Sequence, residues 1–146
     1  MKKILRYLIF LLPWFIGSLL FPNDSLFYKS LNKPTFAPPG YLFAIIWPIL
    51  YILIALSIYK MKDKNKNYLK ALIINYFSNQ IFSFFFFTIK SPFIAMIDTI
   101  IVLISSLYLY LEAKKDNSLS AKLLIPYILW NIFATYLIIS VYIMNI

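Results

Sequence analysis

The sequence contains no cysteine and no histidine among its 146 residues. The absence of cysteine excludes disulfide bonds and thiol chemistry, and the absence of both residue types removes the usual protein ligands of transition metals. Acidic residues are scarce as well: there are five, and they occur one at a time. No nucleophile–base pair or phosphate-binding loop is recognisable either. We therefore expect no metal site, no obligatory cofactor and no conventional catalytic constellation.

Apolar residues, in contrast, are abundant. They make up 62% of the chain, charged residues make up 13%, and the mean hydropathy is +0.80. Soluble domains are about half apolar and about a quarter charged, so most of this surface should face lipid. The net charge is +9, and the charged residues occur in short runs between apolar stretches. That placement favours anionic lipid headgroups, and not nucleic acid, as the neighbours of the basic residues.

Five apolar segments each approach the ~20 residues that a membrane helix needs. They span residues 4–22, 40–60, 68–88, 93–111 and 122–144. Because lipid offers the backbone no hydrogen-bond partners and the segments do not alternate in polarity, all five should be helices. A signal peptide is the alternative for the first segment, but it lacks a small-x-small cleavage site. We expect an all-α integral membrane protein, a bundle of five transmembrane helices forming one domain over residues 1–146.

The basic residues predict an orientation. With alternating helices, one side of the membrane carries 11 of the 14 lysines and arginines, and the other side carries only Lys29, Lys33 and Lys90. Short loops rich in lysine and arginine stay in the cytoplasm. We therefore expect a multi-pass protein of a bacterial cell membrane, with the N-terminus in the cytoplasm and the C-terminus outside.

Residues 33–51, KPTFAPPGYLFAIIWPILY, hold four of the eight prolines. Each proline pushes the residue before it toward extended geometry, so residues 33–39 should form a stiff, non-helical strap. Pro38 and Pro39 suit the start of the following helix, where the missing N–H groups have no helical partner anyway. The strap leads directly into the ring-rich second helix, an arrangement typical of a lid over a cavity.

Pro48 lies inside that second helix, next to Trp47 and one turn before Tyr51. A proline there should kink the helix, because its ring displaces the carbonyl of the residue four positions earlier. The alternative is that Pro48 has no particular role, since neighbouring groups in a membrane helix compensate for the break.

Three separate motifs resemble those of the translocator, or tryptophan-rich sensory, protein family (TspO/MBR). The first is FYKSLNKPTFAPPGYLFAIIWPILY, in which the matching residues are Tyr28, Leu31, Lys33, Pro34, Pro38, Pro39, Trp47, Leu50 and Tyr51. NQIFSFFFF resembles the family motif of the third helix and matches at Asn79. PYILWNIFATYL resembles that of the fifth helix and matches at Pro126, Tyr127, Trp130, Phe133, Ala134 and Leu137.

The resemblance implies a five-helix bundle with a pocket that opens toward the first loop. Family members bind porphyrins such as protoporphyrin and haem, animal members bind cholesterol and drug-like molecules, and some bacterial relatives are linked to light-dependent porphyrin breakdown. By position, the pocket residues are expected to be Ala44, Trp47, Tyr51, Asn79, Phe82, Ile97, Ile101, Trp130, Ala134 and Leu137. The lid is expected to contain Lys33, Pro34, Pro38 and Pro39.

The chain also departs from the family pattern. Tryptophans are replaced by other residues at Phe27, Phe36, Tyr41, Phe82 and Ile94. Rings remain at four of these positions, so stacking should survive better than indole hydrogen bonding. The small residues with which some members pair their third helices are absent, because Lys70 and Ile74 stand there. A homodimer is possible, but not by that route.

The helical spacing supports a pocket independently of the family. Asn75, Asn79, Phe82 and Phe86 follow one stripe of a helix, and the stripe from Trp130 to Leu137 has a small residue in its middle. A ring, a small residue and an apolar residue on facing helices leave a flat slot that suits a planar macrocycle. The alternative is that such stripes only pack helices together.

Polar residues within the apolar segments should face the bundle. We expect Asp98 to form a buried hydrogen bond with a partner such as Asn75 or Asn79, and a proton relay is the alternative. Asn75 and Asn131 should join neighbouring helices. Lys33 is expected either to pair with a ligand carboxylate, such as a porphyrin propionate, or only to anchor the strap.

Three classes of function remain open at this stage. The first is a receptor or transporter for porphyrins or similar flat hydrophobic ligands. The second is light-dependent degradation of a bound porphyrin, with tryptophan as the reactive partner. The third is a small membrane protein that regulates a partner protein.

Overall fold

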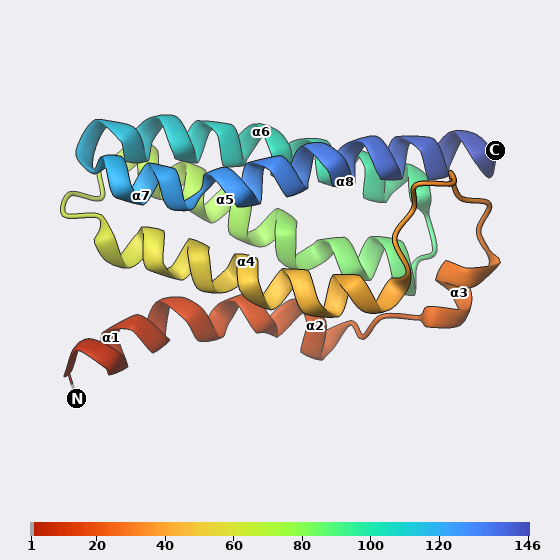
Figure 1. The fold of residues 1–146 in the computed structure, drawn as a ribbon, viewed down its shortest axis with the longest axis horizontal. Coiled ribbons are helices and arrows are strands. Elements are labelled where there is room, and N and C mark those ends of the chain that lie inside the picture. Colours follow the sequence, from red (N-terminus) through yellow and green to blue (C-terminus); the bar gives the residue numbers. More distant parts are fainter. Residues whose placement is uncertain (1) are drawn as a thin grey trace.

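The computed structural model describes residues 2–146, and five helical spans within them are long and apolar enough to cross a membrane. The spans are Lys2–Leu20, Gly40–Lys60, Lys66–Thr88, Pro92–Asp116 and Ser118–Met144. Figure 1 shows them lying side by side, with consecutive spans running in opposite directions. The predicted bundle of five transmembrane helices is therefore confirmed.

The outer surface of the bundle is apolar. Ile9, Ile104 and Ile143, which come from three different spans, are each more than 60% exposed. Exposure of large aliphatic side chains on this scale would be unfavourable in water, but it is what a lipid-facing surface requires. The protein is embedded in the membrane, and the bilayer is its neighbour.

The first span is interrupted, unlike the continuous helix predicted over 4–22. It consists of α1 (Lys2–Leu11), the 3₁₀ turn η1 (Leu12–Phe15) and α2 (Ile16–Leu20). Pro13 lies in the turn and cannot donate a backbone hydrogen bond. Two residues of the third span, one helical turn apart, bind the backbone groups at this break. The hydroxyl of Tyr76 donates to the Pro13 carbonyl (3.0 Å). The side-chain oxygen of Gln80 accepts from the Gly17 N–H (2.7 Å).

The second and third spans follow the prediction closely. The second is α4 (Gly40–Lys60), which continues through Pro48. The third consists of α5 (Lys66–Ser83) and a terminal π-helical turn, η2 (Phe84–Thr88). In that turn the Ile89 N–H donates to the Phe84 carbonyl across five residues (2.9 Å). The turn changes the direction of the phenylalanine side chains just where the third span meets the first loop.

The fourth and fifth spans are longer than predicted. They are α6 (Pro92–Asp116), followed by α7 (Ser118–Leu123) and α8 (Ile125–Met144), and only Asn117 separates α6 from α7. The prediction ended the fourth helix at residue 111, where charged residues begin. Charge marks the end of the apolar run but not of the helix, because lysines in a last turn interact favourably with the helix dipole. Asn117 then caps α7 by accepting from the N–H groups of Leu119 and Ser120.

The first loop is held in place at several points. It contains α3 (Ser25–Ser30), a short helix that the sequence did not predict, capped by the Asp24 carboxylate, which accepts from the Phe27 N–H (2.9 Å). Residues 31–39 are non-helical, as their prolines predict. The Tyr28 hydroxyl donates to the Pro38 carbonyl (2.8 Å), and Asn32 exchanges hydrogen bonds with Asn145 at the end of α8. The loop therefore lies across one end of the bundle, beside the C-terminus (Figure 1).

The two ends of the bundle differ in packing. At the end opposite the first loop, α4 packs closely on α7, where the hydroxyls of Ser57 and Ser120 lie 2.8 Å apart. The largest group of buried apolar residues, including Ile54, Leu109 and Leu124, extends through this part of the bundle. Beneath the first loop the helices are less tightly filled, and this is where the cavity lies.

Candidate ligand-binding cavity

A cavity of about 610 Å³ lies between the helices beneath the first loop. Residues of α2, α3, α4, α5, η2, α6 and α8 line it. Eight of the ten pocket residues predicted from the sequence are brought together around it: Ala44, Trp47, Tyr51, Asn79, Phe82, Trp130, Ala134 and Leu137. The proline inside α4, Pro48, also contributes to the wall.

Ile97 and Ile101, unlike the other eight predicted residues, do not line this cavity. Their side chains are 44% and 43% exposed on the outer face of α6. Thr99 and Val102 line the cavity instead. Thr99 is two positions from Ile97, a turn of about 200° to the opposite face, and Val102 is one position from Ile101, a turn of about 100°. The pattern of small and polar residues along α6 would have identified the inner face, since such residues favour helix contacts in a membrane.

The lid residues divide into two groups. Pro39 lines the cavity, and so does Tyr28 from α3, whereas Lys33, Pro34 and Pro38 do not. The Lys33 ammonium donates to the carbonyls of Tyr28 and Leu31 and lies 4.8 Å from the centre of the Tyr28 ring. These contacts are the ones expected if Lys33 anchors the strap, the second of its two predicted roles.

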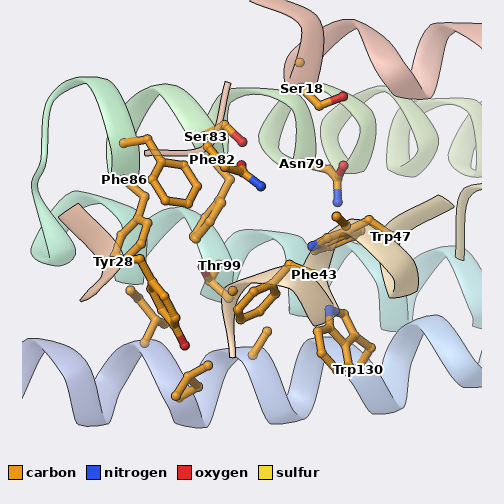
Figure 2. A pocket seen from close by; sticks show the side chains of 18 of the residues that line it. Ser18, Tyr28, Phe43, Trp47, Asn79, Phe82, Ser83, Phe86, Thr99 and Trp130 are labelled. Carbon is orange, nitrogen blue, oxygen red and sulfur yellow. The ribbon is translucent and has the colours of Figure 1, made fainter. Parts of the chain in front are cut away.

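Aromatic rings line the cavity along its length. Near the first loop, Tyr28 meets Phe43 edge-on with ring centres 5.7 Å apart, and Phe82 stacks on Phe86 at 5.5 Å. Toward the middle of the bundle, Phe43 lies 5.9 Å from Trp130. Figure 2 shows Tyr28, Phe82 and Phe86 gathered at one end of the cavity and the two indole rings, Trp47 and Trp130, at the other.

A hydrogen-bonded network closes the inner end of the cavity. Asn79 is its centre: its oxygen accepts from Tyr51 (3.3 Å) and Gln80 (3.2 Å), and its nitrogen donates to the hydroxyl of Tyr127 (3.2 Å). Tyr127 in turn donates to the oxygen of Asn75 (3.0 Å). Through Gln80 the network reaches the break in the first span, so it connects residues from four of the five spans.

The network extends to the remaining span through Asn75. Its amide nitrogen donates to the Val102 carbonyl (3.1 Å) and to the Ser105 hydroxyl (2.9 Å), both on α6. Asn75 therefore joins helices, as the sequence predicted. Membrane-buried amides are stabilised when partners on neighbouring helices satisfy them, and every polar atom of the Asn75 side chain has such a partner.

Asp98 forms the buried hydrogen bond that we expected, but with a different partner. The Ser78 hydroxyl on α5 donates to one of its carboxyl oxygens (2.5 Å), and the hydrogen bonds of Asn75 and Asn79 go to other residues. The other carboxyl oxygen is buried without a partner in residues 2–146. Ser78 lies one turn after Asn75 and one position before Asn79. The sequence therefore identified the helix and the turn that hold the partner of Asp98, but not the partner itself.

Asn131 does not join helices as the sequence predicted. It lines the cavity, it is only 1% exposed, and its amide nitrogen has no hydrogen-bond partner within the described chain. The indole nitrogen of the preceding residue, Trp130, is likewise buried and unpartnered there. Two adjacent donors in α8 are thus buried without a hydrogen-bond partner in residues 2–146.

Charged groups occur at the mouth of the cavity. Asp24, which lines it, pairs with Lys90 from the turn between η2 and α6 (3.1 Å). The backbone N–H of Phe27 and then the Lys90 ammonium lower the pKa of the Asp24 carboxyl below its ordinary value. This carboxylate therefore stays ionised at neutral pH and links α3 to the turn between the third and fourth spans.

The fold and the cavity define a five-helix membrane protein whose aromatic-lined cavity is covered by a proline-rich first loop. Comparison with known sequences identifies the family. Residues 7–144 match the TspO/MBR family. The chain is 40% identical over 136 residues to the tryptophan-rich protein TspO of Bacillus cereus, covering 90% of this chain and 89% of that one. The chain belongs to the TspO/MBR family.

Two further relatives agree with this assignment. The uncharacterized membrane protein YtaB of Bacillus subtilis is 39% identical over an alignment of 156 positions that covers the whole of both chains. The tryptophan-rich protein TspO of Archaeoglobus fulgidus is 30% identical over 126 residues, which cover 81% of this chain and 79% of that one.

Proposed function

We propose that this protein binds porphyrins, such as protoporphyrin or haem, or similarly flat hydrophobic ligands, as a membrane receptor or transporter. The observation that carries the proposal is the cavity of about 610 Å³, lined by aromatic side chains from six elements and roofed by the first loop. Cavities of roughly 300–1,000 Å³ with apolar walls and a few polar groups are typical of small-molecule sites.

The chemistry of the walls supports a flat ligand. Rings from α4 and α8, among them Trp47 and Trp130, offer stacking surfaces, and Ala134 leaves space between them. A planar macrocycle would bury both of its faces against such walls, and aromatic contacts add to the gain from burial alone. The roof of the cavity is held by the hydrogen bond from the Tyr28 hydroxyl to the Pro38 carbonyl and by the Asp24–Lys90 ion pair, so the site is largely organised before a ligand enters.

Titration of the purified protein with protoporphyrin IX and with haem, followed by quenching of tryptophan fluorescence, tests the proposal. Two of the three tryptophans line the cavity and should be quenched together as the ligand binds. Saturable quenching at one ligand per chain is expected. Quenching that rises linearly with ligand and never saturates would show that the porphyrin only dissolves in the detergent or lipid.

Light-dependent degradation of a bound porphyrin is the second candidate. It is favoured by a series of oxidisable rings that leads away from the cavity: Trp47 lies 5.6 Å from Tyr51, and Tyr51 lies 5.7 Å from Trp14. Loss of porphyrin absorbance that requires both light and the protein would support this candidate, and a stable absorbance under illumination would leave binding alone.

We also propose that the N-terminus lies in the cytoplasm, so that the cavity opens toward the outside of a bacterial cell. The 11 basic residues near the N-terminus and in the second and fourth loops support this orientation. Figure 1 shows the N-terminus and those loops at one end of the bundle, with α3 and the C-terminus at the other.

A further inference from the structure

We propose that a groove on the lipid-facing surface between α5 and α6 binds one anionic phospholipid. In this site Lys70 pairs with the headgroup phosphate, and an acyl chain lies along the groove. The groove measures about 360 Å³ and is separate from the cavity beneath the first loop, since the two share no lining residue in the part of the chain that the structure describes. The inference concerns the bilayer and does not depend on the proposed function.

The groove lies between two matching stripes of helical positions. The residues that line it are Asn67, Lys70, Ala71 and Ile74 on α5, and Ile101, Ile104, Ser105 and Tyr108 on α6. In each helix they follow the spacing i, i+3, i+4 and i+7, so they share one face. The two helices pack against each other and run in opposite directions (Figure 1). The start of the first stripe therefore lies beside the end of the second.

Small residues form the floor of the groove, and large aliphatic residues form its rims. Ala71 and Ser105 are 4% and 7% exposed, whereas Ile74 and Ile104 are 44% and 62% exposed. The Ser105 hydroxyl accepts a hydrogen bond from the Asn75 amide (2.9 Å), so the polar group in the floor already has a partner on the neighbouring helix. Such a surface offers a hydrocarbon chain dispersion contacts on three sides and leaves no polar group for the chain to bury unpaired.

One end of the groove is polar. Asn67 and Lys70 lie in the first two turns of α5 and are exposed, and Tyr108, which is 49% exposed, lies two turns before the end of α6. This is the end of the bundle that holds the second and fourth loops, where most of the basic residues are found. A lysine on its flexible stem and a tyrosine ring both suit the level of the lipid headgroups.

Lys70 has no acidic partner within residues 2–146. Glu112, which lies one turn after Tyr108 on α6, pairs with Lys115 instead. Asp116 accepts from backbone N–H groups of the second loop. The charge of Lys70 therefore stays available to an anion, and basic pockets between membrane helices bind the headgroups of anionic lipids.

A second copy of the chain fits the groove less well than a lipid does. Two copies that paired through this face about an axis perpendicular to the membrane would bring the same patch of each copy together. Both Lys70 side chains would then lie at one depth in the interface. None of the described residues that line the groove is acidic, so nothing there would offset the repulsion. An anionic phospholipid supplies the opposite charge and the apolar chain together.

Native mass spectrometry of the detergent-purified protein tests the inference. The probes are dioleoylphosphatidylglycerol and dioleoylphosphatidylcholine, which have the same acyl chains and differ in the net charge of the headgroup. The quantity measured is the ratio of their dissociation constants for the first bound lipid. The variants are Lys70→Gln and Lys122→Gln, which remove the same charge from the same end of the bundle. Lys122 is an exposed residue of α7 that does not line the groove.

We expect the wild-type chain to bind one phosphatidylglycerol about fivefold more tightly than phosphatidylcholine, the value of one lysine beside an anionic headgroup. Lys70→Gln should remove most of this preference, and Lys122→Gln should keep it. Ala71→Leu fills the floor of the groove and leaves the charge unchanged, so it should weaken the first site for both lipids. Should Ala71→Leu not fold, the two lysine variants decide alone.

Several results would overturn the inference. A wild-type chain without a preference for phosphatidylglycerol is one, and an unchanged preference in Lys70→Gln is another. An equal loss in the two lysine variants would show that the lipid responds to the overall charge of this end of the bundle. Unchanged affinities in a folded Ala71→Leu variant would place the lipid elsewhere. A wild-type dimer that Ala71→Leu dissociates would assign the groove to a second copy of the chain.

Discussion

The amide nitrogen of Asn79 donates to the hydroxyl of Tyr127 across 3.2 Å, and this bond joins α5 to α8 directly beneath the cavity. The same hydroxyl donates to Asn75. One tyrosine oxygen therefore satisfies two buried amides in a membrane interior, where no water replaces a lost partner.

Tyr127→Phe should consequently destabilise the bundle, although it removes a single oxygen. Two amide groups would lose a partner, and an unsatisfied buried polar group costs about 1–3 kcal/mol. Thermal unfolding in detergent measures the effect. Tyr110→Phe is the matched control, since the Tyr110 side chain is partly buried but its hydroxyl makes no hydrogen bond within residues 2–146. Equal melting temperatures for the two variants would contradict the role of the network.

Gly17→Ala should separate the first span from the third. A Cβ at Gly17 would lie 2.6 Å from the backbone oxygen of Gln80, which cannot move without shifting α5. Such overpacking typically costs about 1–3 kcal/mol. The control is Gly40→Ala, whose Cβ would meet Tyr28 at an ordinary 3.6 Å. We expect a lower melting temperature for the first variant only, and the opposite order would refute the close contact.

The prolines of the strap should matter more for binding than for stability. The change is the replacement of Pro34, Pro38 and Pro39 with alanine. The hydrogen bond from the Tyr28 hydroxyl to the carbonyl of residue 38 can still form, because that carbonyl belongs to the backbone. What is lost is stiffness, so the loop must be ordered when the ligand binds. The affinity for protoporphyrin IX should therefore fall clearly, while the melting temperature of the ligand-free protein should change little. A collapse of the melting temperature with normal affinity in the remaining folded protein would assign the prolines to folding alone.

Trp47→Leu and Trp130→Leu should each weaken porphyrin binding by roughly threefold to tenfold. Each change removes a stacking surface worth about 0.5–1.5 kcal/mol beyond burial and keeps an apolar side chain. Fluorescence quenching by the ligand, or its absorbance change, provides the measurement.

Trp14→Leu is the comparison variant, because Trp14 does not line the cavity. It is 2% exposed and packs behind Tyr51, so its replacement should lower the melting temperature more than the affinity. The same loss of affinity in all three variants would mean that the quenching does not report on the cavity.

The orientation is testable with single cysteines, since the chain has none of its own. Asp63→Cys and Thr35→Cys place thiols at exposed positions on opposite ends of the bundle. In intact bacterial cells, an impermeant maleimide should label the cysteine at residue 35 and not the one at residue 63. The reverse pattern would show that the N-terminus lies outside.

The sequence by itself determined the bundle. Apolar runs of membrane-spanning length leave helices as the way to satisfy the backbone in lipid, so the number of spans and their approximate limits follow from composition. Proline restricts its own backbone and that of the residue before it, so the non-helical strap over 33–39 was also predictable. The family motifs placed eight residues around one cavity because each motif fixes the helical face of its neighbours.

Only the tertiary structure decided which polar groups pair. Hydrogen bonds between helices depend on the rotation and depth of each helix, and local sequence does not specify either. The sequence could not show that Ser78, and not an asparagine, binds Asp98. It could not show that α6 turns Thr99 inward and Ile97 outward, or that Gln80 reaches the break at Gly17. Asn79 and Asn131 look alike in sequence, and they differ because the first meets Tyr51, Gln80 and Tyr127 in space while the amide nitrogen of the second has no hydrogen-bond partner in residues 2–146.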